Sequence, residues 1–257
     1  MSLSFVVNGK VYQVKSLLGQ GGFSTVYETT DGYALKCIAA TKKDYTQEEI
    51  YRFYLIEKLA LLALRSKYVV QIFNSGRNET HYFLVLEKFG KSLDDYLESK
   101  GFLEEQIVAL FKKCLESLRH IHRQGYVHRD INLLNILLEN GEVRITDFGF
   151  CQPIYEIQSR LEWDQEFLHG MIGYVAPEVL EVPEYDHFKR DIFGLGRSFY
   201  RILTLGSIPF QLDQPIPPLE HVACMGNPKI FQIVNKMIAL NPINRYGMVD
   251  EILVDCN

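Results

Sequence analysis

Two short stretches decide how this chain is interpreted. Residues 128–135 read His-Arg-Asp-Ile-Asn-Leu-Leu-Asn, and residues 147–149 read Asp-Phe-Gly. In the first stretch Asn135 follows Asp130 by five residues, and Asp147 opens the second stretch seventeen residues after Asp130. Two motifs of this length at fixed spacing are too specific a pattern to arise by chance.

The two stretches resemble the eukaryotic protein kinase family of the Ser/Thr type, which carries HRD with an Asn five residues after the Asp, and then DFG. Further matches follow in order along the chain. Ala176-Pro177-Glu178 matches the APE element, residues 191–196 match the start of the central helix of the large lobe, and Arg245 matches the late arginine that pairs with the APE glutamate. The resemblance covers about residues 12 to 253.

This resemblance implies an α+β fold, the bilobal protein kinase fold of a minimal catalytic domain. The whole chain, residues 1–257, is expected to be one protein kinase domain. Within it we expect a small β-rich N-lobe with one main helix at residues 1–86, a hinge at 87–90 and a larger helical C-lobe at 91–257.

Patterning outside the two stretches agrees with such a chain. Apolar residues recur at helical spacing over residues 47–64 and again over 107–121, which predicts two amphipathic helices. From Asp191 onward the chain reads as helices separated by Pro/Gly loops. Strands are expected at residues 5–12 (a pair around an Asn-Gly turn), 26–28, 33–38, 82–86, 136–138 and 143–145.

Composition excludes several function classes. A net charge of -5 and a pI near 5.8 come without a basic stripe, so a nucleic-acid partner is not expected. No apolar run approaches the ~20 residues of a membrane span, and no membrane association is expected. Five scattered cysteines without a CxxC pair predict an intracellular protein, cytoplasmic or nuclear. The sequence does not predict an oligomeric state.

Residues 19–26, Gly-Gln-Gly-Gly-Phe-Ser-Thr-Val, form a glycine-rich segment between two expected strands. Glycines let backbone N–H groups approach phosphate oxygens, although a glycine-rich turn without a ligand has the same pattern. No helix follows, which argues against a dinucleotide fingerprint or a Walker loop. Ser24 stands at the third glycine of the kinase pattern and is small enough to replace it.

Lys36 lies in an otherwise apolar expected strand, where an unpaired charge would be costly to bury. Glu57, on the helix expected at 47–64, is the best candidate for its anionic partner. Glu48 and Glu49 stand at the start of that helix, where carboxylates favour the helix dipole. The alternative is that Lys36 and Glu57 form an ordinary surface pair.

The resemblance implies catalytic roles for Lys36, Asp130, Asn135 and Asp147, with ATP and Mg²⁺ as cofactors and a protein as substrate. Lys36 would hold the α- and β-phosphates, and Glu57 would fix its side chain. Asp147 and Asn135 would each bind a magnesium ion. Asp130 would accept or orient the proton of the substrate hydroxyl.

The resemblance also implies a nucleotide-binding set. Leu86 matches the gatekeeper, and Glu87, Lys88 and Phe89 match the hinge that reads adenine through its backbone. Val26, Ala34 and Leu137 match the apolar positions that enclose the adenine ring, and ordinary core packing is the alternative for these three. Asp94 or Asp95 is a candidate for a ribose contact, and a favourable charge at a helix start is the alternative. The full expected set is Leu18, Gly19, Gly21, Gly22, Ser24, Val26, Ala34, Lys36, Glu57, Leu86, Glu87, Phe89 and Leu137.

Two positions depart from the family. Ser/Thr kinases usually carry a lysine two residues after the catalytic aspartate, and this chain has Asn132. Losing that cation would cost on the order of 10²-fold in rate. The threonine that bonds to this lysine and aspartate corresponds to Met171, whose side chain cannot make the bond. The pair indicates either a correlated redesign of the site or weakened catalysis.

Three alternatives to an active Ser/Thr kinase therefore stay open. Weakened catalysis would make the chain a pseudokinase or a nucleotide-binding scaffold. Dual or tyrosine specificity is a second alternative, although Gly173-Tyr174-Val175 looks like the Ser/Thr pattern. A small-molecule kinase is the third, and the intact APE element with Asp191 and Arg245 disfavours it.

Regulation is expected to involve Arg129, because kinases with this arginine often use it to bind an activation-loop phosphate. We expect a carboxylate to take that place here, with phosphorylation of Ser159 or Tyr155 as the alternative. The segment 150–170 offers the carboxylates of Glu156, Glu162, Asp164 and Glu166. The proline-rich stretch 209–228 predicts a short connection where the family has a longer helical insert.

Overall fold

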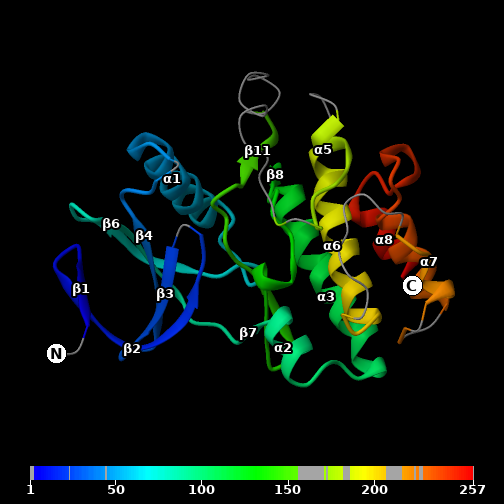
Figure 1. The fold of residues 1–257 in the computed structure, drawn as a ribbon, viewed down its shortest axis with the longest axis horizontal. Coiled ribbons are helices and arrows are strands. Elements are labelled where there is room, and N and C mark those ends of the chain that lie inside the picture. Colours follow the sequence, from blue (N-terminus) through cyan, green and yellow to red (C-terminus); the bar gives the residue numbers. More distant parts are fainter. Residues whose placement is uncertain are drawn as a thin grey trace. The chain divides into compact units, whose positions relative to one another are not determined.

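The computed structural model describes residues 3–22, 24–43, 45–155, 171, 173–181, 186–206, 216–222, 224–225 and 228–256. The chain divides into two compact units (Figure 1). The first comprises Met1–Phe89 together with Phe148–Phe150, and the second comprises Gly90–Asp147 and Cys151–Asn257. The first is rich in strands and the second is mostly helical, which confirms the α+β class.

The first unit is built on one antiparallel six-stranded sheet with the order β1-β2-β3-β4-β6-β5. Asn8 and Gly9 form the β1–β2 turn with φ values of 48° and 79°, as expected for an Asn-Gly hairpin. The strands are β1 (Ser4–Val7), β2 (Lys10–Gln20), β3 (Ser24–Thr29), β4 (Tyr33–Ala39), β5 (Ile72–Arg77) and β6 (His81–Glu87). All strands expected in this part of the sequence are present, and β5 is additional.

Helix α1 (Gln47–Ala63) packs against β4, β5 and β6. It begins at a capping box, in which the Thr46 hydroxyl accepts from the N–H of Glu49 at 3.2 Å while the Glu49 carboxylate accepts from the N–H of Thr46 at 2.6 Å. The box satisfies backbone donors that the first helical turn leaves without partners. The helix therefore starts where the sequence predicts it, and Glu49 caps it.

The second unit is organised around two long helices, α3 (Glu104–Arg123) and α6 (His187–Leu203). Phe111 of α3 and Phe199 of α6 meet with ring centroids 4.6 Å apart, and both are fully buried. The sequence places the start of the central helix at Asp191, but α6 begins four residues earlier at His187. Asp186 caps it by accepting backbone bonds, a signal that apolar periodicity does not carry.

Shorter elements complete the second unit. The expected hairpin at Asn140-Gly141 is confirmed, and it joins a three-stranded sheet with the order β10-β9-β7, while β11 pairs with β8. The strands are β7 (Lys91–Ser92), β8 (Tyr126–Val127), β9 (Ile136–Glu139), β10 (Glu142–Ile145) and β11 (Gln152–Pro153). The other helices in the described part of the chain are α2 (Leu93–Ser99), η1 (Leu133–Asn135), α5 (Glu178–Glu181), η2 (Leu219–His221), α7 (Pro228–Met237), η3 (Pro242–Asn244) and α8 (Val249–Asp255).

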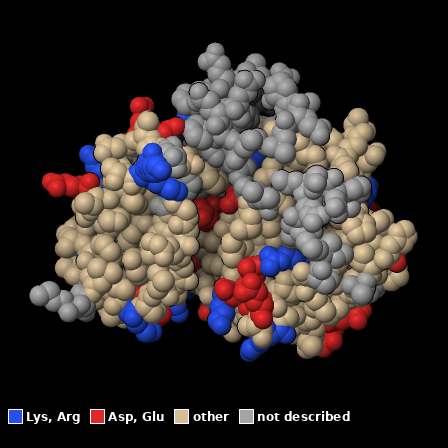
Figure 2. All heavy atoms as spheres, in the orientation of Figure 1, with Lys and Arg blue, Asp and Glu red and all other residues tan. Residues whose placement is uncertain are grey.

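All five cysteines are free thiols, and three of them are buried: Cys37 in the first unit, and Cys114 and Cys151 in the second. Within the described ranges, no helix combines the length and the apolar character needed to cross a membrane. On the face drawn in Figure 2, Lys and Arg side chains occur in small groups interspersed with Asp and Glu. Half of the proline-rich stretch 209–228 lies outside the described residues.

Candidate active site

The glycine-rich segment runs from the end of β2 to the start of β3, and Gly21 and Gly22 lie between the two strands, as the sequence predicts. The N–H of Gly21 donates to the carbonyl of Ser24 at 2.8 Å. A side chain at Gly19 would meet no atom within 4 Å, and the ammonium of Lys42 donates to the carbonyl of Gly22. Open space beside a glycine backbone suits the approach of an anion to its N–H groups.

Lys36 and Glu57 form a buried ion pair within the first unit. The Nζ of Lys36 donates to Glu57 Oε1 at 2.8 Å and to Oε2 at 2.7 Å, and the two side chains are only 8% and 2% exposed. Glu57 points inward because it shares one face of α1 with the buried Ile50, Tyr54 and Leu61. The pair is therefore not the surface pair that the sequence left open, and two short bonds fix the position of the ammonium group.

Other residues expected to bind nucleotide fall in both units. In the sheet register of the first unit, Val26 lies opposite Lys36, and Ala34 lies opposite Leu86. Ala34 and Leu86 are both buried. The remaining members are the exposed Leu18 of β2, Glu87 at the end of β6 and Phe89 in the first unit, and Leu137 of β9 in the second. Their contact with adenine stays a prediction.

Asp130 is held by three hydrogen-bond donors. Its Oδ1 accepts from Asn132 Nδ2 at 3.1 Å and from the backbone N–H of Met171 at 3.0 Å, while its Oδ2 accepts from Asn135 Nδ2 at 2.8 Å. Burial and the charge of Asp147 raise the pKa of Asp130, although the bonds from Met171 and Asn135 lower it in part. The carboxylate is thus fixed in direction, and its raised pKa makes it a stronger proton acceptor.

The Asp191 carboxylate holds, through hydrogen bonds, the backbone that leads into Asp130. Its Oδ2 accepts from the N–H of His128 at 2.7 Å, its Oδ1 accepts from the N–H of Arg129 at 2.8 Å, and the ring of His122 bonds to Oδ2 at 3.0 Å. These bonds hold Arg129 at a φ of 69°, a left-handed conformation that non-glycine residues rarely adopt.

The sequence marks Asp191 as the start of the central helix and, with the APE element and Arg245, as evidence against a small-molecule kinase, but it does not predict this anchoring role. A signal was available, because Asp191 directly precedes the apolar Ile192 and Phe193 in a central helix. A carboxylate at such a position must find donors when it is buried.

Asp147 is tied to the same loop through its neighbour Thr146. The N–H of Thr146 donates to the carbonyl of Asn135 at 3.0 Å, and the ring of His128 bonds to the carbonyl of Thr146 at 3.0 Å. Asp147 itself has a φ of 62°. Asp130, Asn135 and Asp147 belong to the second unit, and these backbone bonds connect the loop that carries the first two residues to the strand end that carries the third.

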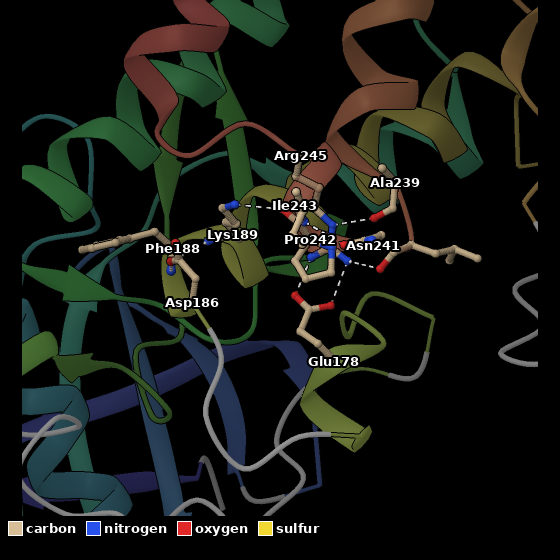
Figure 3. A network of polar contacts seen from close by, with 10 residues as sticks. Glu178, Asp186, Phe188, Lys189, Ala239, Asn241, Pro242, Ile243 and Arg245 are labelled. Carbon is tan, nitrogen blue, oxygen red and sulfur yellow. Dashed lines mark hydrogen bonds and ion pairs between the residues drawn. The ribbon is translucent and has the colours of Figure 1, made fainter.

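The APE glutamate pairs with the late arginine, as the resemblance implies. Arg245 donates to Glu178 at 2.5 Å and 2.8 Å through its two terminal nitrogens, and also to the carbonyls of Ala239 and Leu240 at 2.6 Å and 3.0 Å (Figure 3). The Arg245 side chain is fully buried and lies over the ring of Phe193 at 4.7 Å. The pair thus joins α5 to the segment that precedes α8.

Two of the expected regulatory residues, Arg129 and Tyr155, lie among the described residues. Arg129 is 4% exposed and its carbonyl accepts from Arg190 at 2.8 Å. Tyr155 is 66% exposed. The other candidates lie outside the described residues, namely Glu156, Ser159, Glu162, Asp164 and Glu166. Occupation of the Arg129 site by a carboxylate therefore stays a prediction.

Comparison with known proteins agrees with this geometry. The family model described as the protein kinase domain matches residues 12–253, which is nearly the whole chain. It includes each of the positions discussed above, from the glycine-rich turn to Arg245.

Individual relatives carry the same assignment in their names. The chain is 30% identical over 240 residues to serine/threonine-protein kinase shk1/pak1 of Schizosaccharomyces pombe, covering 89% of this chain and 36% of the relative. It is 32% identical over 226 residues to serine/threonine-protein kinase pakA of Talaromyces marneffei, covering 86% and 34%. It is 32% identical over 261 residues to serine/threonine-protein kinase cds1 of Schizosaccharomyces pombe, covering 91% and 55%. The chain spans about a third of the length of the first two relatives.

Proposed function

The chain belongs to the protein kinase family, and on that premise we propose that it transfers the γ-phosphate of MgATP to serine or threonine hydroxyls of protein substrates. The observation that carries this proposal is the buried ion pair between Lys36 and Glu57. Kinase activity requires this lysine and this helix glutamate to be in contact. Burying such a pair has a desolvation cost that can exceed its attraction, so its retention suits a functional role better than a stabilising one.

The residues present fit MgATP by their chemistry. Lys36 would hold the α- and β-phosphates, since its ammonium is a fixed cation in the first unit. Asp147 and Asn135 would supply carboxylate and amide oxygens, which are ligands that Mg²⁺ prefers. The charge of Asp147 already raises the pKa of Asp130, so negative charge accumulates here that a divalent cation would offset.

No group of three His, Cys, Asp or Glu side chains suited to a metal ion occurs among the described residues. The proposed site differs from such a cluster, because its remaining magnesium ligands would be phosphate oxygens and water. Bound MgATP supplies the transferable phosphoryl group and the cation that neutralises its charge.

Asp130 would accept the proton of the substrate hydroxyl during the transfer. The hydroxyl oxygen forms a new bond to the γ-phosphorus, the bond from that phosphorus to the bridging oxygen of ADP breaks, and the proton goes to the Asp130 carboxylate. Asn135 orients this carboxylate, because its Nδ2 donates both to Asp130 Oδ2 at 2.8 Å and to the Asp130 carbonyl at 2.9 Å. The Oδ1 of Asn135 is not used in these bonds and would face the cation.

Serine and threonine of proteins are the proposed acceptors for two reasons. The relatives are named serine/threonine-protein kinases. The Glu178–Arg245 pair is formed, and it belongs to the part of the family fold that supports protein substrates. An intracellular location, cytoplasmic or nuclear, is proposed with it, because all five cysteines are free thiols.

The test is transfer of labelled γ-phosphate from MgATP to generic basic proteins and to the protein itself. Wild type is compared with Lys36→Met and Asp147→Asn, and the labelled amino acid is identified. We expect label on serine or threonine that falls to background in both variants. Phosphotyrosine would revise the specificity. Wild-type label no higher than in the variants, with ATP binding intact, would make the chain a nucleotide-binding pseudokinase.

A further inference from the structure

Asn132 occupies the position where Ser/Thr kinases usually have a lysine, and the structure shows what its side chain does. It is 2% exposed. Its Nδ2 donates to Asp130 Oδ1 at 3.1 Å and to the Asp130 carbonyl at 3.1 Å. Its Oδ1 accepts from the N–H of Leu134 at 3.0 Å.

The orientation of this amide follows from its partners. The N–H of Leu134 can only donate, so the atom facing it must be the amide oxygen. The amide nitrogen then faces two acceptors of Asp130. The backbone carbonyl can only accept, and the carboxylate can only accept when it is ionised. Both ends of the Asn132 side chain are therefore engaged, and the donor and acceptor character of its partners determines its orientation.

Asn132 supplies one of the three bonds that described residues make to the Asp130 carboxylate. Without it, the donors that the described residues offer this carboxylate would be the backbone N–H of Met171 to Oδ1 and Asn135 to Oδ2. The threonine bond that this family usually makes at position 171 is replaced here by a main-chain bond. The two departures from the family thus converge on the same oxygen of the same carboxylate.

We propose that Asn132 is a positioning residue for phosphoryl transfer, holding the Asp130 carboxylate in the direction from which it accepts the substrate proton. This inference rests on the proposed kinase function. A neutral amide gives direction to the carboxylate without adding a charge to the transferring phosphate. The two departures are then a coordinated replacement that maintains catalysis.

The competing explanation is that Asn132 only caps η1 through its bond from Leu134. Asn132→Asp separates the two roles, because aspartate keeps an oxygen for the N–H of Leu134 and caps about as well as asparagine. The substitution replaces the donor that faces Asp130 with an oxygen. Asn132→Ala removes the same donor without adding a charge.

The chain offers a matched control at Asn241. Its Oδ1 accepts from the N–H of Ile243 at 2.9 Å and caps η3, which is the same kind of cap on the same kind of helix (Figure 3). Unlike Asn132, Asn241 is exposed. Asn241→Asp and Asn241→Ala therefore report the cost of losing the amide from a 3₁₀ cap alone.

We expect kcat for a peptide substrate to fall on the order of 10²-fold in both Asn132 variants, because small misplacements of a catalytic group cost about that much. KM for ATP and for the peptide should stay within about twofold of wild type. The Asn241 variants should keep wild-type kcat. In a crystal structure of Asn132→Ala, the Asp130 carboxylate should be rotated or occupy several conformations.

Two results would overturn the inference. Wild-type kcat in both Asn132 variants, while Lys36→Met is inactive, refutes the role of Asn132 and leaves the kinase function standing. An unchanged, single Asp130 conformation in Asn132→Ala refutes it structurally, whatever the activity. By contrast, wild-type transfer no higher than that of Lys36→Met refutes the proposed function itself and this inference with it.

Discussion

At the scale of single residues, Asp191 shows how a buried carboxylate is kept ionised. Burial alone would raise its pKa, but the hydrogen bond and charge of His122, together with the charge and backbone N–H of His128, lower the pKa below its ordinary value. Among the described residues, the titratable groups that face it are His122 on α3, His128 and Arg129 of the segment that leads into Asp130, and Cys151. The folded state therefore favours the charged form of Asp191.

We expect Asp191→Asn to lower the free energy of unfolding by about 3 kcal/mol at neutral pH, since it disrupts a buried charge network. A lowered pKa in the folded state stabilises the protein above the unfolded value of about 3.9. That stabilisation is lost as the pH falls through 3.9 toward the folded pKa. Urea unfolding at pH 6 and near pH 3 should show the gap between wild type and variant narrowing in acid, and a constant gap would contradict the assignment.

Single residues also show where sequence reasoning succeeds. The motifs identify Lys36, Asp130 and Asp147 as candidate catalytic residues. The structure confirms the predicted pairing of Lys36 with Glu57. The sequence does not predict the bond from Met171, because the residue type does not specify which backbone N–H group will donate. The rule that a methionine side chain cannot replace threonine is correct, but the backbone makes the bond instead.

At the scale of elements, the close packing of α6 depends on two glycines, which leave room for other segments to approach the helix. A Cβ added at Gly194 would stand 2.6 Å from the carbonyl oxygen of Ile131, next to Asp130. A Cβ added at Gly196 would stand 2.7 Å from Cβ of Met237 and 2.8 Å from Cγ2 of Ile238. Contacts under 3.0 Å leave no room for a methyl group, so the helix packs tightly only because it lacks these side chains.

Gly194→Ala should therefore destabilise the protein by about 1–3 kcal/mol, as overpacking usually does. This outcome opposes helix propensity, which favours alanine over glycine by about 1 kcal/mol. Thermal unfolding checks it, with Gly19→Ala as the control, because a methyl group there meets no atom within 4 Å. Stabilisation by Gly194→Ala would show that the close approach to Ile131 is not maintained in solution.

Elements differ in how well the sequence predicts them. Helix α3 has a sustained apolar period, and its expected and observed positions agree. Strand β5 reads Ile-Phe-Asn-Ser-Gly-Arg and contains Asn and Gly, two residues disfavoured in strands, so no strand is expected there. Its formation comes from pairing with β6 and from Asn74, whose side chain bonds to the Val7 carbonyl and the Tyr12 hydroxyl at 3.3 Å and 3.2 Å. Such long-range contacts override local preference.

At the scale of the whole molecule, the pair between Glu178 and Arg245 links positions 67 residues apart in the chain. Removing either partner should cost about 3–5 kcal/mol, because it leaves a buried charge without its counterion. Arg245→Met should cost more than Glu178→Leu, since it also abandons the carbonyls of Ala239 and Leu240.

A double-mutant cycle on unfolding free energies measures this coupling. The double variant should be less destabilised than the sum of the two single variants, because no buried charge is left without a partner. Additive single effects would show that Glu178 and Arg245 contribute independently. The resemblance predicts this pair, but it does not predict the two carbonyls, because their position depends on how the backbone before η3 folds.

The buried thiols are natural probes of the rate at which each unit opens. Burial raises the pKa of Cys37 in the first unit to about 12, and it also raises the pKa of Cys114 in the second unit. While its unit is folded, each sulfur is shielded and almost never a thiolate, the only form that attacks a disulfide reagent. Exposure returns the thiol to an ordinary pKa near 8.5 and makes it reactive. The modification rates at Cys37 and Cys114 thus time the opening of each unit separately, without any introduced probe.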